Sequence, residues 1–200
     1  MLSGMTVFPA AALSDSDDPY AYMEEIEGPR AMAFATAENA RSLPQLQNDP
    51  RYAGLYDDAL AIATAKDRIT AVGFAGDGTL RNFWQDAEHV RGLLRATTLE
   101  SYRTGKPEWR TVLDIDALAK AEGKNWVWKG ADCLAPDDRF CLVSLSDGGK
   151  DAVEVREFDV QTGQFVKDGF LLPEGKHRFT WVDADTLAVA TEWTKGEVTT

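Results

Sequence analysis

The chain has 200 residues, with 21 basic and 33 acidic side chains and a formal charge of −12. Binding to nucleic acid or docking on an anionic membrane needs a basic face, so this charge argues against both partners. A hydrophobic fraction of 44% and a charged fraction of 27% are typical of a globular protein.

Residues 1–17 contain a short apolar piece, an Ala-rich patch and the first members of an acidic cluster, Asp15, Asp17 and Asp18. No Lys or Arg precedes the apolar piece, whereas a secretory signal normally begins with a positive region. We therefore predict a disordered leader over 1–17, with a degenerate signal as the alternative and Met5 as an alternative start. The acidic cluster lacks the glycine and the terminal Glu of a calcium-binding loop.

Residues 18–66 are predicted to form a helical segment. The stretch 28–48 is rich in helix-forming residues, and Pro29 suits a first helical turn. Pro44 is expected to kink this helix or end it early. Asp49-Pro50 is typical of a second helix start, and apolar residues then recur at helical spacing to about residue 65.

From residue 68 the hydrophobic period shortens to that of strands and turns. We predict ten strands, over 69–74, 79–84, 90–98, 109–115, 126–130, 140–145, 153–160, 165–172, 179–182 and 187–193. Gly-rich or Asp-rich turns at 75–78 and 183–186 predict hairpins, and 116–122 predicts a short helical turn. The run 140–145 is expected to be buried on both faces, and a change of apolar phase between Val155 and Phe158 suggests a bulge. Such spacing is typical of a sandwich, a barrel or a propeller, and the pattern alone leaves a propeller and a sandwich open.

No group of residues in the sequence amounts to an active site. There is no G-x-S-x-G nucleophile elbow, and the run 144–149 is better interpreted as a strand end and a turn. His89 and His177 lie among polar, loop-like residues and are predicted to be solvated rather than catalytic. We predict no catalytic, cofactor-binding or metal-binding residue and no cofactor.

The cysteines and tryptophans are predicted to be structural. Cys133 and Cys141 lie eight residues apart, and we expect two buried free thiols, with a disulfide only if the strand register makes them face each other. Free thiols favour a cytoplasmic location, with the periplasm as the alternative. The tryptophans are expected to pack between sheets rather than to line a sugar or peptide site: Trp84, Trp109, Trp126, Trp128, Trp181 and Trp193.

One set of motifs resembles the prolyl oligopeptidase family of serine peptidases. It begins with Asp18-Pro-Tyr and continues to Gly28, with Met23 where the family usually has Leu and Phe34 where Trp is common. Further stretches with this resemblance are 31–43, 49–52, 81–86, 91–102, 125–128 and 144–149.

The resemblance implies a fold and a function. In that family a helical segment packs on an α/β-hydrolase domain, and a seven-bladed β-propeller limits the substrates to short peptides cut after proline. It implies a mainly β chain with an N-terminal helical segment over 18–66 and about two propeller blades over 67–200. The partners it implies are short proline-containing peptides and the parent protein's own C-terminal hydrolase domain.

The sequence also departs from the family, because none of its residues can be matched to a member of the family's catalytic triad. We therefore expect the chain to be an N-terminal fragment of a peptidase, inactive by itself. Two alternatives stay open: a stand-alone propeller-derived binding module, and the lid of another oligopeptidase-type hydrolase.

Overall fold

The structure is a computed structural model, and it describes residues 18–25, 27–65 and 70–191. The chain divides into two compact units between Ile62 and Ala63, a helical unit and a β unit, which are described separately. Within the described ranges, no helix is both long enough and apolar enough to cross a membrane. The predicted leader over 1–17 lies outside the described residues.

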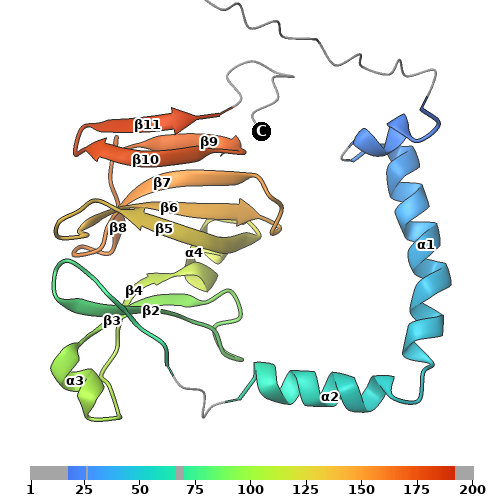
Figure 1. Cartoon of the computed structure of the whole chain (residues 1–200), viewed down its shortest axis with the longest axis horizontal. Coiled ribbons are helices and arrows are strands. Elements are labelled where there is room, and N and C mark those ends of the chain that lie inside the picture. Colours follow the sequence, from blue (N-terminus) through green and yellow to red (C-terminus); the bar gives the residue numbers. More distant parts are fainter. Residues whose placement is uncertain (1–17, 26, 66–69, 192–200) are drawn as a thin grey trace, which may run out of the picture. The chain divides into compact units, whose positions relative to one another are not determined.

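The helical unit contains the 3₁₀ helix η1 (Ala21–Glu24) and the α-helices α1 (Pro29–Gln47) and α2 (Tyr52–Ala63) (Figure 1). Pro29 occupies the first turn of α1, as predicted. The expected early end at Pro44 is wrong, because α1 continues to Gln47. The missing N–H of Pro44 removes one helical hydrogen bond, but bonding continues past it, since the Pro44 carbonyl accepts the N–H of Asn48 at 3.1 Å.

The side chains of both α-helices are largely exposed. No residue of α1 or α2 is buried, and on α2 Leu55 is 65% exposed and Ile62 is 73% exposed. Contacts within this unit therefore leave the predicted apolar face of α2 uncovered.

The first sheet of the β unit has four antiparallel strands in chain order: β1 (Gly73–Phe74), β2 (Thr79–Trp84), β3 (Leu93–Thr98) and β4 (Arg110–Asp114). The hairpin at 75–78 is confirmed, with the Ala75 N–H donating to the Thr79 carbonyl at 2.9 Å. A short helix that the sequence did not predict, α3 (Leu99–Arg103), follows β3. The predicted helical turn is α4 (Ile115–Glu122), which Asp114 caps and Gly123 ends.

The second sheet contains β5 (Trp126–Cys133), β6 (Phe140–Asp147), β7 (Val153–Asp159), β8 (Gln164–Phe165) and β9 (Leu171–Gly175). The first four strands are paired in chain order. Strand β8 pairs with the end of β7, and β9 pairs with the earlier part of β7. Strand β6 is largely buried, as its apolar run predicted. The irregularity in β7 lies against β9 between Val153 and Val155, closer to the start of the strand than the predicted bulge.

The prediction of free thiols is wrong. Cys133 at the end of β5 and Cys141 in β6 are direct cross-strand partners, with Cα atoms 3.9 Å apart, and they form a disulfide. Their spacing of eight residues did not determine this pairing. It follows from the register between β5 and β6, which that spacing leaves open.

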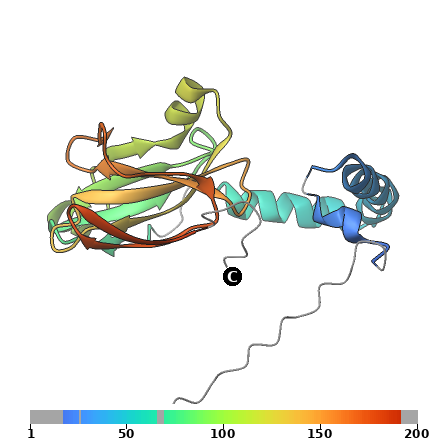
Figure 2. The ribbon, with the colours of Figure 1, turned by 90° about the horizontal axis from the view of Figure 1, so that it is seen from above.

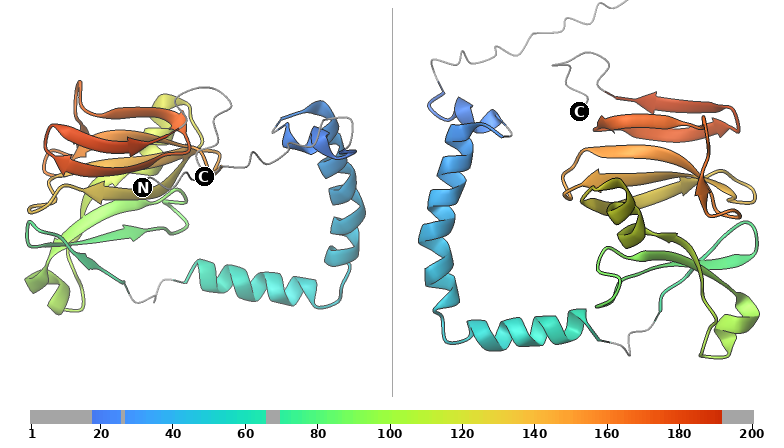
Figure 3. Two further views of the ribbon diagram at one scale, coloured as in Figure 1. Left: turned by 45° about the horizontal axis from the view of Figure 1, so that its top comes forward. Right: turned by 180° about the vertical axis from the view of Figure 1, so that it is seen from behind.

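A third sheet consists of the hairpin β10 (Arg178–Asp183) and β11 (Thr186–Ala190). The three sheets form successive layers in Figure 1, and their strands overlie one another in the view from above in Figure 2. Helix α4 lies beside the first and second sheets (Figure 3) and contacts β3 and β5.

The hydrophobic core lies between the first two sheets and α4. Its buried members come from both sheets and the helix: Leu94, Ala96, Val112, Leu113, Ile115, Ala119, Trp126, Cys141, Val143, Leu145, Phe158 and Val160. Each large side chain removed from water here contributes about 1.5–3 kcal/mol. The sheets are therefore joined mainly by their faces.

Candidate functional site

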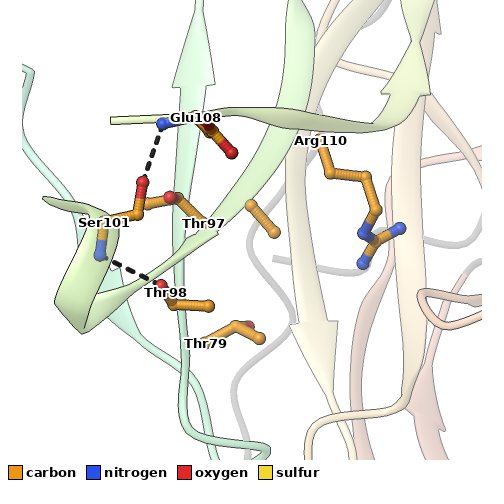
Figure 4. Close-up of a pocket in the computed structure, with 7 residues that line it drawn as sticks. Thr79, Thr97, Thr98, Ser101, Glu108 and Arg110 are labelled. Atoms are coloured by element: carbon orange, nitrogen blue, oxygen red, sulfur yellow. Dashed lines mark hydrogen bonds between the residues drawn. The ribbon is translucent and has the colours of Figure 1, made fainter. Parts of the chain in front are cut away.

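A polar pocket of about 280 Å³ lies in the first sheet, beside α3 (Figure 4). Its lining residues come from β2, β3, α3, the segment before β4 and the start of β4: Thr79, Ala96, Thr97, Thr98, Ser101, Glu108 and Arg110. The Thr98 hydroxyl caps α3 by accepting the Ser101 N–H at 3.1 Å, and the Ser101 hydroxyl accepts the Glu108 N–H at 2.8 Å.

Two features give this pocket some capacity to bind a polar group. Thr97 is 6% exposed, and its buried hydroxyl has no hydrogen-bond partner among the described residues. Within the part of the chain that the structure describes, the Arg110 guanidinium donates to the Val160 carbonyl alone, at 3.4 and 3.5 Å. The pocket lining contains neither His nor Lys, and Ser101 is committed to backbone contacts. We find no arrangement here that would activate a nucleophile.

His89 belongs to a turn held together by Asp86. The Asp86 carboxylate accepts hydrogen bonds from Trp84 Nε1 at 2.9 Å and from the backbone N–H of His89 at 2.8 Å. These bonds hold the pKa of Asp86 well below its usual range, the Trp84 bond being the largest cause. His89 Nδ1 lies 3.0 Å from the same carboxylate. The contact orders the turn between β2 and β3 and brings no nucleophile to the imidazole.

His177 links the loop after β9 to the end of β11. Its Nε2 lies 2.6 Å from the Pro173 carbonyl, which can only accept, and its Nδ1 lies 2.7 Å from the Thr191 hydroxyl. Both ring nitrogens therefore have hydrogen-bond partners within the protein, whereas the sequence predicted a side chain surrounded by solvent.

Ser146 ends a strand, as predicted. It is fully buried, and its hydroxyl donates to the Lys150 carbonyl at 2.7 Å across the turn after β6. Within the described ranges, no group of three His, Cys, Asp or Glu residues is arranged to hold a metal ion.

Three of the described tryptophans pack between sheets, as the sequence predicted, whereas Trp84 and Trp109 contact Arg95 of the first sheet. Trp126 is 2% exposed, Trp128 stacks on Phe83 with 5.2 Å between ring centroids, and Trp181 Nε1 donates to the Asp132 carbonyl. Trp193 lies outside the described residues.

Three arginines join parts of the β unit, although no sequence pattern pointed to them. The guanidinium of Arg95 lies 4.3 Å from the ring centroid of Trp84 and 4.2 Å from that of Trp109. Arg156 pairs with Glu122 of α4, and Arg81 extends from the first sheet to the turn after β5. Each of these arginines has one hydrogen-bond partner far away in the chain, 13 residues from Arg95, 34 from Arg156 and 57 from Arg81, so local pattern does not connect these pairs.

A family model described as the prolyl oligopeptidase N-terminal beta-propeller domain matches residues 6–200. The chain belongs to the prolyl oligopeptidase family. The fold prediction is thereby confirmed: the three sheets of the β unit are part of a β-propeller that is not closed within this chain, preceded by a helical segment.

Two curated relatives and one solved structure of the family are similar to the chain. An uncharacterized peptidase of Sinorhizobium fredii is 56% identical over 191 residues, which are 96% of this chain and 26% of the relative. An uncharacterized peptidase of Rickettsia prowazekii is 33% identical over 187 residues, 89% of this chain and 26% of the relative. The structure of a post-proline cleaving enzyme from Rickettsia typhi superimposes with a TM-score of 0.76 at 30% identity. It covers 88% of this chain and 27% of that enzyme, so the chain spans about a quarter of these relatives.

Proposed function

We propose that the chain is the N-terminal part of a serine endopeptidase of the prolyl oligopeptidase family that cleaves short peptides after proline. The observation that carries this proposal is the similarity of the chain, at 30% identity, to an enzyme described as post-proline cleaving. In the proposal the propeller restricts the size of the substrates that reach the active site.

The proposed parts are a helical segment over 18–66 and the first blades over 67–200. The proposed partner of the helical segment is the enzyme's own hydrolase domain. The exposed apolar side chains of α2 support this, since Leu55 and Ile62 would be covered by such a domain. The chain by itself is proposed to be inactive, because the described residues bring no nucleophile, base and oxyanion donors together.

The test is to extend the reading frame beyond Thr200 and express the complete protein. We expect cleavage of a short peptide with proline before the scissile bond and loss of activity with a serine-reactive inhibitor. The matched control is the same peptide with alanine in place of proline, which should be cut much more slowly. Equal rates for both peptides would refute the proline preference and favour another oligopeptidase-type hydrolase.

The propeller's proposed role needs a separate comparison. The same post-proline sequence is presented in a short peptide and in an unfolded protein of more than a hundred residues. The short peptide should be cut and the long chain spared. A stop codon directly after Thr200 would instead favour the stand-alone binding module.

The cytoplasmic location expected from free thiols loses that support, so for the compartment we propose the alternative, the periplasm. The Cys133–Cys141 disulfide favours the alternative, because disulfides persist in oxidising compartments. Fractionation of cells that produce the protein distinguishes the two.

A further inference from the structure

The cysteine pair closes the turn between β5 and β6, which contacts the first sheet. The Leu134 N–H donates to the Phe140 carbonyl at 2.8 Å inside the disulfide-closed loop. Cys141 is 1% exposed, whereas Cys133 is only partly buried. A dissolved thiolate can therefore approach the Cys133 sulfur far more easily than the Cys141 sulfur.

A cation from the neighbouring sheet lies beside both sulfurs. Nη1 of Arg81, on β2, is 3.8 Å from Cys133 Sγ and 3.8 Å from Cys141 Sγ. The same nitrogen donates to the Asp138 carbonyl at 2.8 Å, and Nη2 pairs with Asp77 at 2.7 Å. The Arg81 Nε–H is buried and has no partner within the described ranges. A nearby guanidinium stabilises a thiolate over a thiol, and a more stable thiolate is a better leaving group.

The turn touches the first sheet at a second point. The Gly76 N–H, in the turn between β1 and β2, donates to Asp138 Oδ2 at 2.7 Å. Asp138 thus receives a hydrogen bond from Gly76 on its carboxylate and one from Arg81 on its carbonyl. The disulfide therefore closes the loop whose conformation presents Asp138 to both partners.

We propose that Cys133 and Cys141 form a reversible redox clamp that locks the first two blades together when oxidised and loosens their junction when reduced by a small or protein dithiol. A thiolate of the reductant attacks Cys133 Sγ and forms a mixed disulfide. The electron pair of the broken S–S bond leaves with Cys141 Sγ, as a thiolate beside Arg81. The second thiol of the reductant then displaces Cys133. The protein gains two electrons and two protons, and the reductant becomes a disulfide.

The first experiment uses the chain purified in air without reductant. Alkylation under denaturing conditions, read by mass spectrometry, should label neither cysteine before dithiothreitol treatment of the folded chain and both after it. Labelling of both cysteines before reduction would overturn the proposal, because no disulfide would have formed.

The second experiment measures the rate of reduction by dithiothreitol in three variants. Arg81→Gln should slow reduction about threefold or more, since the leaving thiolate loses its cation. Arg81→Lys should stay near the wild-type rate. Arg91→Gln is the matched control, because the Arg91 guanidinium donates to the Trp126 carbonyl, at the opposite end of β5 from Cys133. Equal rates for Arg81→Gln and Arg91→Gln would overturn the assigned role of Arg81.

The third experiment tests the clamp itself by hydrogen exchange. Reduction should speed exchange in peptides covering 73–81 and 134–140, and the Cys133→Ser, Cys141→Ser double variant should show the same faster exchange without reductant. Peptides covering β6 and β7 should change little. Unchanged exchange in both turn peptides on reduction would overturn the clamp.

Discussion

Replacing Gly76 by alanine should weaken the contact between the first two sheets through a steric clash. The expected loss of stability is larger than the loss of glycine's conformational freedom alone would cause. A Cβ atom at this position would lie 1.8 Å from the carbonyl oxygen of Pro136, a distance at which backbone must move. Gly76 does not have a positive φ, so alanine fits its own backbone conformation. The effect of Gly76→Ala is therefore a steric effect on the contact between the two turns.

The size of the effect follows from what the clash would displace. Moving the turn breaks the hydrogen bond from the Gly76 N–H to the Asp138 carboxylate and disturbs the Arg81 contact with the same residue. A hydrogen bond to a charged group is worth about 1.5–3 kcal/mol, and overpacking adds about 1–3 kcal/mol. Because the displaced turn recovers hydrogen bonds from water, we expect a net loss of about 2–4 kcal/mol in the free energy of unfolding.

Gly78 provides the matched control two residues away. It has a φ of +80°, and a Cβ atom there would have no neighbouring atom within 4 Å, so alanine meets a conformational penalty and no clash. We expect Gly78→Ala to cost about 1 kcal/mol. Urea unfolding followed by tryptophan fluorescence gives both values. Equal losses for Gly76→Ala and Gly78→Ala would refute the close contact between the turns.

Three further predictions concern packing, charge and helix capping in the β unit. Phe158→Leu should lower the free energy of unfolding by about 1–2 kcal/mol in urea titrations, because the fully buried ring loses its edge contact with Phe165. The pKa of Asp159 is lowered, chiefly by the hydrogen bond from Arg139, so this carboxylate stabilises the fold above its unfolded pKa of about 3.9 and loses that effect as pH falls through its folded pKa. Asp159→Asn should therefore flatten the acid side of a stability–pH profile, and a profile as steep as the wild type would contradict this. Asp114→Ala should cost about 1 kcal/mol by uncapping α4, and Asp114→Ser should restore most of it; thermal melts of the three proteins decide.

Sequence pattern predicted the elements whose signals are local. The nearly continuous apolar run of β6 indicated its burial, and the Gly-rich stretch at 75–78 indicated the first hairpin. The short helical turn predicted over 116–122 is α4, which starts one residue earlier, at Ile115. In each case the residues that determine the structure are close together in the chain.

The features that escaped prediction depend on partners far apart in the chain or on register. The disulfide needed the register between β5 and β6, which a spacing of eight residues leaves open. The unpredicted α3 is only five residues long, too short for a helical period to be detected. The polar pocket beside α3 combines hydroxyls from three elements, and none of them is unusual by itself.

The junction between the first two sheets shows how these two levels combine. Each sheet is built from local hairpins, but the contact between them depends on Gly76, Arg81 and Asp138, which are 57 to 62 residues apart across the two sheets. The apolar core supplies most of the free energy of that contact without fixing the position of one turn against the other, since apolar burial is not directional. Directional bonds to Asp138 fix that position, and the close approach at Gly76 leaves little room for an alternative. A change at these few polar atoms should therefore alter how the sheets are joined while each sheet keeps its own strand pairing.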